Sequence, residues 1–133
     1  MFKSITAVEP NKILYKGLKD KLKKDNIKNV KTINNYAEDF EIYQKFDLIL
    51  CMNSFLFIKD KDVILKKFNK LLKPGGYLLI SEPTMFLSLK ADKERNNEML
   101  STLKLFINSK DYNLIFYGVV SKRQITYLLE KCN

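Results

Sequence analysis

The sequence predicts an α/β fold with a mostly parallel sheet and helices on both faces of that sheet. Residues 77–80 form a continuous apolar run and residues 46–51 are apolar apart from Asp47, as expected for parallel strands covered on both sides. The segment 60–72 between them has apolar residues at helical spacing, and a helix that links two buried strands is typical of an α/β fold. We therefore predict that residues 46–80 form one right-handed β-α-β unit.

The composition indicates a single small domain inside the cell. The chain has 133 residues, of which 46% are hydrophobic, and one domain of this length can bury a core. No apolar run approaches the ~20 residues needed to cross a membrane, and the first residues do not resemble a signal peptide. Cys51 and Cys132 are the only cysteines, which fits a reducing compartment. We therefore expect a cytoplasmic protein with no membrane partner.

The ionisable residues limit the kinds of catalytic and binding site that the chain can form. The chain has no histidine, so imidazole bases and the usual zinc sites are excluded and no metal site is predicted. The formal net charge is +9, and much of the excess lies in the lysine-rich segment 12–28. A solvated helix face explains this segment best, because basic charge without a reading motif is weak support for nucleic-acid binding. A nucleic-acid partner is disfavoured but stays open.

The first third of the chain predicts a strand, a helix and a second strand. Residues 2–8 form the first strand, and a helix begins after Glu9 at Pro10 or Asn11, since proline suits the first turn and asparagine caps it. Residues 29–33 form the second strand, and the acidic segment 36–40 is expected to be a loop or helical turn. The helix is expected to bury a stripe of apolar residues: Leu14, Leu18 and Leu22, helped by Ile13 and Tyr15.

The stretch 71–83 predicts the end of a helix, a forced turn and a buried strand. Pro74 cannot continue the helix, and Gly75 and Gly76 can adopt the positive φ that the reversal requires. In open α/β sheets ligands bind outside the carboxyl ends of the strands, so Glu82 is a candidate for chemistry. The preceding helix is expected to bury Ile64, Leu65, Phe68, Leu71 and Leu72.

The last third of the chain has a weaker pattern. Apolar residues at helical spacing predict a helix over residues 99–107, and residues 113–120 are rich in strand formers. Ser121 and Gln124 have the spacing of a capping box, so the apolar residues within 125–129 predict a last short helix.

Four motifs, in this order, resemble those of class I S-adenosylmethionine-dependent methyltransferases, which have a Rossmann-like fold. Residues 8–11, Val-Glu-Pro-Asn, resemble the end of that family's second strand, and residues 37–40, Ala-Glu-Asp-Phe, resemble the loop that lines the adenine. Residues 46–53 resemble the fourth strand and its loop. Residues 71–82, with their Pro-Gly-Gly turn, resemble the fifth strand and are the most specific match. The resemblance implies a partial class I methyltransferase fold that uses S-adenosylmethionine.

The resemblance also implies which residues bind the cofactor, although it implies no catalytic residue. A carboxylate at the end of the second strand would accept hydrogen bonds from both ribose hydroxyls. The adenine loop and the loop after the fourth strand would contact the two ends of the cofactor. The implied residues are Glu9 for ribose, Ala37 and Glu38 for adenine, and Cys51, Met52 and Asn53 for the other end.

Each of these candidates also has a structural interpretation. Glu9 could stabilise the start of the helix that follows it, and Glu38 could be a solvated loop acid. Asn53 could hydrogen-bond its own backbone, and Cys51 is typical of a small buried packing residue. Glu82 could likewise be a structural acid rather than a catalytic one.

Two departures from the family pattern shape the expected organisation. The family's first strand and Gly-rich loop would lie before Met1, and the chain contains no G-x-G-x-x-G sequence. The family also continues into two further strands, and we expect this chain to stop before them. The chain is then a fragment-like, partial domain over residues 1–133, with residues 84–120 as its substrate-binding or lid region.

The function we predict is S-adenosylmethionine-dependent methyl transfer to a nitrogen or oxygen of a small molecule, with RNA as an open alternative acceptor. The alternative is a truncated or degenerate methyltransferase-like chain without activity. Such a chain would act by association, because a missing central strand leaves an open sheet edge for a protein partner or a second copy. Nicotinamide-cofactor binding also uses an acid after the second strand, but the Pro-Gly-Gly turn disfavours it.

Overall fold

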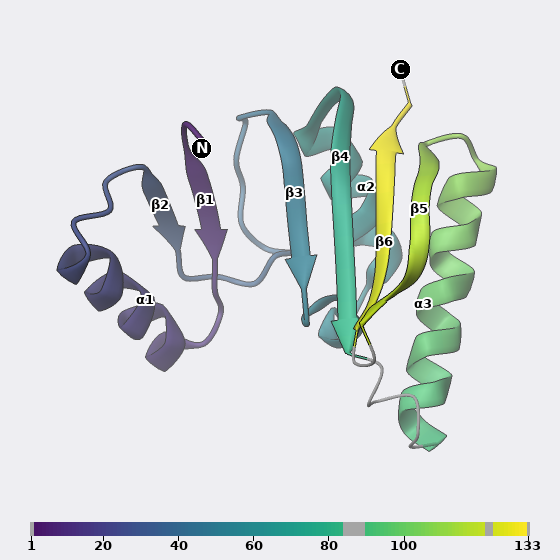
Figure 1. Ribbon diagram of the computed structural model, residues 1–133, viewed down its shortest axis with the longest axis horizontal. Helices are drawn as coiled ribbons and strands as arrows, with labels where there is room; N and C mark the ends of the chain where they lie inside the picture. Colours follow the sequence, from purple (N-terminus) through teal and green to yellow (C-terminus); the bar gives the residue numbers. More distant parts are fainter. Residues whose placement is uncertain (1, 84–89, 122–123, 133) are drawn as a thin grey trace. The chain divides into compact units, whose positions relative to one another are not determined.

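The computed structural model describes residues 2–83, 90–121 and 124–132, and it confirms the predicted α/β class (Figure 1). The chain divides into two compact units, Met1–Ile42 and Tyr43–Asn133. Part of the predicted lid region, residues 84–89, lies outside the described residues. Among the described residues, no helix is long and apolar enough to span a membrane.

The first unit is a β-α-β arrangement built from β1 (Ile5–Val8), α1 (Lys12–Lys24) and β2 (Val30–Ile33). The strands pair in parallel with Ile5 opposite Val30 and Val8 opposite Ile33. Helix α1 begins at the predicted cap, because the Asn11 Oδ1 accepts hydrogen bonds from the backbone N–H groups of Ile13 (2.9 Å) and Leu14 (3.2 Å). The carboxyl ends of β1 and β2 therefore lie side by side.

The predicted buried stripe of α1 is only partly confirmed. Tyr15, Leu18 and Leu22 are half-buried, but Ile13 and Leu14 are exposed, and no residue of Lys12–Lys24 is fully buried. The prediction for Ile13 and Leu14 was therefore wrong. Helical spacing identifies the apolar side of a helix, but burial also requires another element against the first turn.

The second unit contains a four-stranded sheet in the order β3-β4-β6-β5. Strands β3 (Phe46–Met52) and β4 (Leu72–Pro83) pair in parallel, with Leu50 opposite Leu79 and Met52 opposite Ser81. Strands β5 (Tyr112–Ser121) and β6 (Gln124–Lys131) run antiparallel to each other, and β6 runs antiparallel to β4. Parallel pairs therefore occur in both units, and the C-terminal hairpin adds antiparallel pairs to the second.

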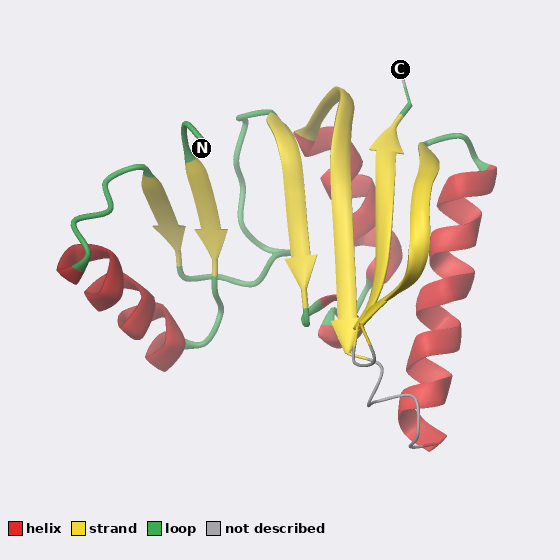
Figure 2. Cartoon of the chain, in the orientation of Figure 1, coloured by secondary structure: helices red, strands yellow, loops and turns green. Residues whose placement is uncertain are grey.

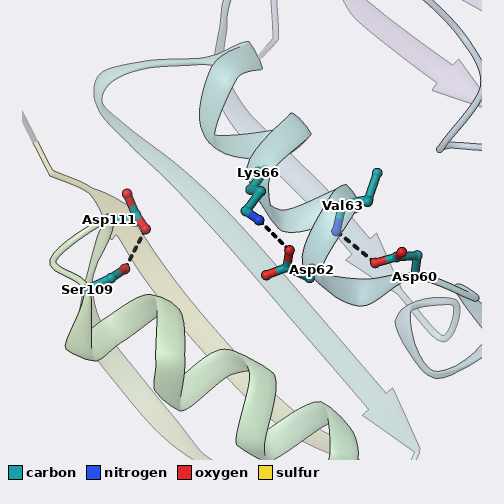
Figure 3. A network of polar contacts seen from close by, with 6 residues as sticks. All are labelled: Asp60, Asp62, Val63, Lys66, Ser109 and Asp111. Carbon is teal, nitrogen blue, oxygen red and sulfur yellow. Dashed lines mark hydrogen bonds and ion pairs between the residues drawn. The ribbon is translucent and has the colours of Figure 1, made fainter.

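Helix α2 (Lys61–Leu71) joins β3 to β4, as predicted. Asp60 caps it, because its Oδ1 accepts a hydrogen bond from the Val63 N–H at 3.0 Å (Figure 3). Within the same first turn, Asp62 pairs with Lys66 one turn further along the exposed side of the helix. A short 3-10 helix, η1 (Phe55–Phe57), lies between β3 and α2. The predicted inner residues are all buried: Ile64, Leu65, Phe68, Leu71 and Leu72.

The Pro-Gly-Gly turn lies within the first part of β4, where the register with β3 shifts, and it confirms the interpretation of this sequence. Gly75 has a φ of +69°, a conformation that is costly for residues with a Cβ atom. A side chain at Gly76 is disfavoured for a different, steric reason. A Cβ there would lie 2.9 Å from the Lys73 carbonyl oxygen and 3.2 Å from that of Phe46. The two glycines therefore allow the chain to reverse tightly against β3.

The predicted helix after Ser121 is wrong, because residues 124–131 form strand β6 between β4 and β5 (Figure 2). Burial alternates along this segment, with Ile125, Tyr127 and Leu129 buried and the residues between them half-buried. That period of two is the strand signal. The described chain thus contains two strands after β4, contrary to the expectation that it stops before the family's last two strands. Of these two, β5 covers residues 113–120, whose richness in strand formers the sequence analysis noted.

The helices of the second unit pack against one face of its sheet. Helix α3 (Lys90–Asn108) contacts α2, η1 and β5, and α2 contacts β4. The helical prediction for residues 99–107 is confirmed, with Met99, Leu103 and Phe106 buried. On the other face, the register places Leu50 and Met52 of β3 beside Leu79 and Ser81 of β4, and Leu50 and Met52 are more than half exposed.

Candidate functional site

The candidate residues in the first unit lie where β1 and β2 end. Glu9 follows β1 directly, and its backbone N–H donates a hydrogen bond to the Ile33 carbonyl oxygen at 3.0 Å. Its half-buried carboxylate accepts the Asn11 N–H at 2.8 Å through Oε1. Asn34 fixes the same segment from β2, because its side-chain amide donates to the Glu9 carbonyl oxygen at 2.8 Å. The carboxylate is therefore held at the carboxyl edge of the parallel pair.

The predicted adenine loop is a turn in the first unit. The backbone N–H groups of Asp39 and Phe40 donate to the Tyr36 carbonyl oxygen at 3.2 and 3.3 Å. Ala37 and Glu38 occupy this turn and are both half-buried. The turn follows β2, so it is connected to the strand that pairs with the Glu9 strand. The segment is therefore the turn that its acidic sequence suggested.

The candidate residues in the second unit lie at the carboxyl end of β3. Cys51 is buried, and its Sγ lies 3.3 Å from the Ser54 Oγ, whereas Met52 is exposed. Asn53 has a φ of +54°, which asparagine tolerates better than most residues. Its backbone N–H donates to the Ser81 carbonyl oxygen at 2.7 Å. The strand therefore ends by turning sharply while it stays bonded to β4.

A polar cluster surrounds Asn53 where β3, β4 and β6 meet. The Gln124 side-chain amide donates to the Asn53 Oδ1 at 3.1 Å, and the Gln124 Oε1 accepts the Ser81 hydroxyl at 2.8 Å. The hydroxyls of Ser81 and Thr126 are 3.0 Å apart. Asn53 therefore bonds to a side chain 71 residues later in the chain rather than only to its own backbone. Its orientation is fixed from two strands.

Glu82 is next to this cluster and faces the opposite side of β4. Its Oε1 accepts hydrogen bonds from the backbone N–H groups of Ser54 at 3.1 Å and Phe55 at 2.6 Å. The residue is only 3% exposed. Its Oε2 is buried and has no hydrogen-bond partner among the described residues. A buried carboxylate oxygen without a partner is costly.

The environment of Glu82 raises the pKa of its carboxyl group. Burial is the largest cause, because it disfavours the charged form. The backbone N–H groups of Phe55, Ser54 and Leu56 and the positive charge of Lys61 act in the other direction. Lys61 is itself buried; its ammonium group donates to the Ile58 carbonyl oxygen at 3.2 Å and pairs with Glu98 at 3.6 Å. Such a perturbed acid at a strand end is a candidate for function.

The structure thus places the candidate residues in two groups, one on each unit. Glu9, Ala37 and Glu38 belong to the first unit, and the residues after β3 belong to the second. Sequence reasoning missed Ser54 and Gln124, which contact Cys51 and Asn53, and Thr126, which contacts Ser81. Gln124 could have been found from the alternating pattern that begins at Ile125, because that pattern makes it the first residue of a strand beside β4.

The sequence matches the methyltransferase-domain family over residues 5–133. The chain therefore belongs to this family. Among curated proteins, no sequence matches significantly.

Several solved structures share the fold of this chain. An S-adenosylmethionine-dependent methyltransferase from Clostridium acetobutylicum is 15% identical with a TM-score of 0.75, and the match covers 99% of this chain and 76% of that one. The N-methyltransferase NodS from Bradyrhizobium japonicum, in complex with S-adenosyl-L-homocysteine, is 10% identical with a TM-score of 0.72, covering 98% and 68%. An rRNA methylase from Streptococcus thermophilus is 13% identical with a TM-score of 0.71, covering 98% and 75%. At these identities the likeness shows the fold alone.

The described residues fit parts of an S-adenosylmethionine molecule. The Glu9 carboxylate has one oxygen on Asn11 and stands at a strand end, where a diol can donate to it. The segment from Cys51 to Asn53 is fixed at a second strand end. Ligands of open α/β sheets bind at such ends. Within the first unit, the Glu9 carboxylate therefore suits a ligand with hydroxyl groups, and the sequence contains no Gly-rich phosphate-type loop.

Proposed function

We propose that this protein transfers the methyl group of S-adenosylmethionine to a nitrogen or oxygen atom of a small molecule. Membership of the methyltransferase family supports methyl transfer in general. The observation that carries the cofactor part of the proposal is the Glu9 carboxylate, which is held at the carboxyl end of β1 by the Asn11 N–H. NodS, which has the same fold, is an N-methyltransferase, and this supports nitrogen as one of the two acceptor atoms.

Each candidate residue has a role in this proposal. Glu9 accepts hydrogen bonds from the ribose hydroxyls, and the turn with Ala37 and Glu38 lines the adenine. Cys51, Met52 and Asn53 lie beside the other end of the cofactor. The whole chain acts as one methyltransferase-like domain, and its segment 84–120 covers the substrate.

The reaction requires the protein to position the reactants, and it does not require a covalent intermediate. S-adenosylmethionine supplies a methyl group on a positively charged sulfur, which is already a good leaving group. The protein's residues hold the acceptor atom in line with that methyl group and exclude water. Phe55 and Leu56, which are buried directly after the Asn53 loop, are placed to exclude water at this end of the sheet.

Calorimetric titration with S-adenosylhomocysteine tests the cofactor claim. We expect saturable binding to the purified chain and a loss of about tenfold or more in affinity for Glu9→Ala, since about 1.4 kcal/mol corresponds to tenfold. Asp20→Ala, which removes an exposed acid of α1, is the matched control and should bind normally. A dissociation constant of about 1 mM corresponds to a binding free energy of about −4 kcal/mol. If the chain shows no binding at about 1 mM S-adenosylhomocysteine, the proposed activity is excluded for this chain.

Association between two copies of the chain is the second candidate function. It is supported by the exposed apolar residues on the open face of the second unit's sheet, Leu50 and Met52 on β3 and Tyr77 on β4. A patch of this kind often marks an interface. Sedimentation velocity over a wide concentration range should show a dimer that Leu50→Glu disrupts. A monomer at every concentration would exclude self-association. If the chain instead forms a complex only with another protein, that protein is the partner and not a second copy of the chain.

A further inference from the structure

One oxygen of the Glu82 carboxylate ties the loop after β3 to the end of β4. Oε1 accepts hydrogen bonds from two successive backbone N–H groups, those of Ser54 at 3.1 Å and Phe55 at 2.6 Å. The preceding residue, Asn53, donates its own N–H to the Ser81 carbonyl oxygen at 2.7 Å. Two consecutive residues of β4 therefore hold three consecutive residues of the loop.

The negative charge of Glu82 is not required to form these bonds. The amide oxygen of glutamine could accept from the same two N–H groups without the cost of a buried charge. The second carboxylate oxygen, Oε2, is buried without a partner among the described residues. Further hydrogen bonds to this oxygen therefore do not account for the presence of a carboxylate at this position. What the carboxylate adds is strength, because a hydrogen bond to an ionised acceptor is about twice as strong as one to a neutral acceptor.

We propose that Glu82 is a positioning residue for the cofactor, and that ionisation of its carboxyl group controls how firmly the loop Asn53–Phe55, directly after Met52, is held. This inference rests on the proposed function, because Met52 and Asn53 are the residues that we propose to contact the cofactor. Glu82 does not touch the cofactor in this proposal. It acts through Ser54 and Phe55, whose N–H groups it binds directly.

Protonation weakens the hold without abolishing it. The proton goes to Oε2, which has no described partner, and Oε1 remains as a neutral acceptor. Among the described residues, the charge that acts on Glu82 is that of Lys61 of α2, which favours the ionised form and is itself paired with Glu98 of α3. Helix η1 carries no titratable group, and Ile125 of β6 is opposite Glu82 in the sheet. Burial outweighs Lys61, so protonation occurs at a higher pH than for an exposed glutamate.

The first experiment needs no cofactor. Amide chemical shifts of Ser54 and Phe55 are followed by NMR as a function of pH in the intact chain, together with the side-chain carbonyl shift of Glu82. We expect all three to report one transition, above the normal range of glutamate. In Glu82→Gln the two amides keep similar shifts but lose the transition. Glu94→Gln, which changes an exposed glutamate of α3, is the control and should retain it.

The second experiment measures the affinity for S-adenosylhomocysteine. Wild-type affinity should fall as the pH is lowered through the Glu82 transition, by roughly threefold to tenfold for the weakening of two charge-assisted bonds. Glu82→Gln should show the low-pH affinity at every pH. Glu82→Ala, which removes both bonds, should bind more weakly than either.

The outcomes separate this inference from the proposed function. If the wild-type chain binds no S-adenosylhomocysteine while the amides of Ser54 and Phe55 titrate with Glu82, the proposed function fails and the loop contact is upheld. If the two amides do not follow Glu82, or if Glu82→Gln binds with the wild-type pH dependence, the positioning role is overturned. A poorly folded Glu82→Ala leaves the Gln variant to decide the question.

Discussion

The hydroxyl group of Tyr112 donates a hydrogen bond to the carbonyl oxygen of Leu65 at 3.1 Å, and this contact joins the start of β5 to the middle of α2. Tyr112 is almost completely buried, and its ring lies against that of Phe106 with the ring centres 6.2 Å apart. Burial raises the pKa of Tyr112, so its hydroxyl stays protonated and remains a donor. The C-terminal hairpin is therefore fastened to the helix that joins the two parallel strands.

Replacing Tyr112 with phenylalanine tests the value of that hydrogen bond. Tyr112→Phe should lower the free energy of unfolding by about 1 kcal/mol, the usual net contribution of one buried hydrogen bond, because the ring is retained and packing is unchanged. Urea denaturation measures the loss. Tyr43→Phe is the matched control, since Tyr43 is 92% exposed, and an equal loss in both variants would contradict the role of the Leu65 contact.

Local patterns in the sequence were sufficient for the central β-α-β unit and insufficient for the C-terminal strand. The run at residues 77–80 is apolar throughout and is preceded by a turn that only Pro74, Gly75 and Gly76 explain, so the strand was predictable. Residues 121–131 contain both a capping-box spacing and an alternating pattern. The alternating pattern prevails because β6 pairs with β4, with Ile80 opposite Tyr127. That pairing joins residues far apart in the chain, so the local patterns alone did not decide between a helix and a strand.

The candidate site shows the same division between local and distant information. Asn53 could be predicted because it follows an apolar strand and precedes Ser54. Its contact with Gln124 could not, because 71 residues separate the two side chains. Glu82 was recognised as a strand-end acid. The amides that it binds, however, belong to a loop whose path depends on how η1 packs against the sheet.

The two glycines of the Pro-Gly-Gly turn within β4 predict a different outcome from Gly17 in α1. A Cβ on Gly76 would meet three backbone oxygens within 3.3 Å, so Gly76→Ala should destabilise the protein by about 1–3 kcal/mol. A Cβ on Gly17 would meet nothing within 4 Å. Gly17→Ala should therefore stabilise by up to about 1 kcal/mol, because alanine favours the helix.

Thermal and urea unfolding of the glycine variants measure the change in the free energy of unfolding. Gly17→Ala serves as the control for the general effect of adding a methyl group. Gly75→Ala is expected to fall on the destabilised side, by about 1–2 kcal/mol, because its φ of +69° disfavours a Cβ atom. A Gly76→Ala variant as stable as the wild type would show that the Lys73 and Phe46 carbonyl groups can move aside.

The pKa of Glu82 predicts how stability depends on pH. Its folded-state pKa is raised above the ordinary value of 4.5, so the folded state binds the proton more tightly than the unfolded state. The contribution of this group is fully present below pH 4.5 and is lost as the pH rises through the folded-state pKa. Glu82→Gln cannot ionise. Its stability relative to the wild type should therefore increase with pH across this window.

Urea denaturation of both proteins at pH values on either side of the Glu82 transition checks this prediction. Lys61→Met adds a second check, because removing the positive charge should raise the pKa of Glu82 further and move the window to higher pH. If the Gln variant instead became relatively less stable as the pH rose, the two hydrogen bonds to Ser54 and Phe55 would outweigh burial, and the direction given for the pKa would be wrong.

The contact between Gln124 and Asn53 predicts that the antiparallel strand β6 affects cofactor binding. Gln124→Ala removes the bond to the Asn53 Oδ1 and the one from the Ser81 hydroxyl, so the side chain of Asn53 loses its fixed orientation. We expect the affinity for S-adenosylhomocysteine to fall by about threefold to tenfold and the free energy of unfolding to fall by about 1 kcal/mol. Gln44→Ala, at an exposed glutamine of the second unit, is the matched control and should change neither. Unchanged affinity in Gln124→Ala, with the expected loss of stability, would mean that the cluster serves the sheet alone and that Asn53 lies outside the cofactor site.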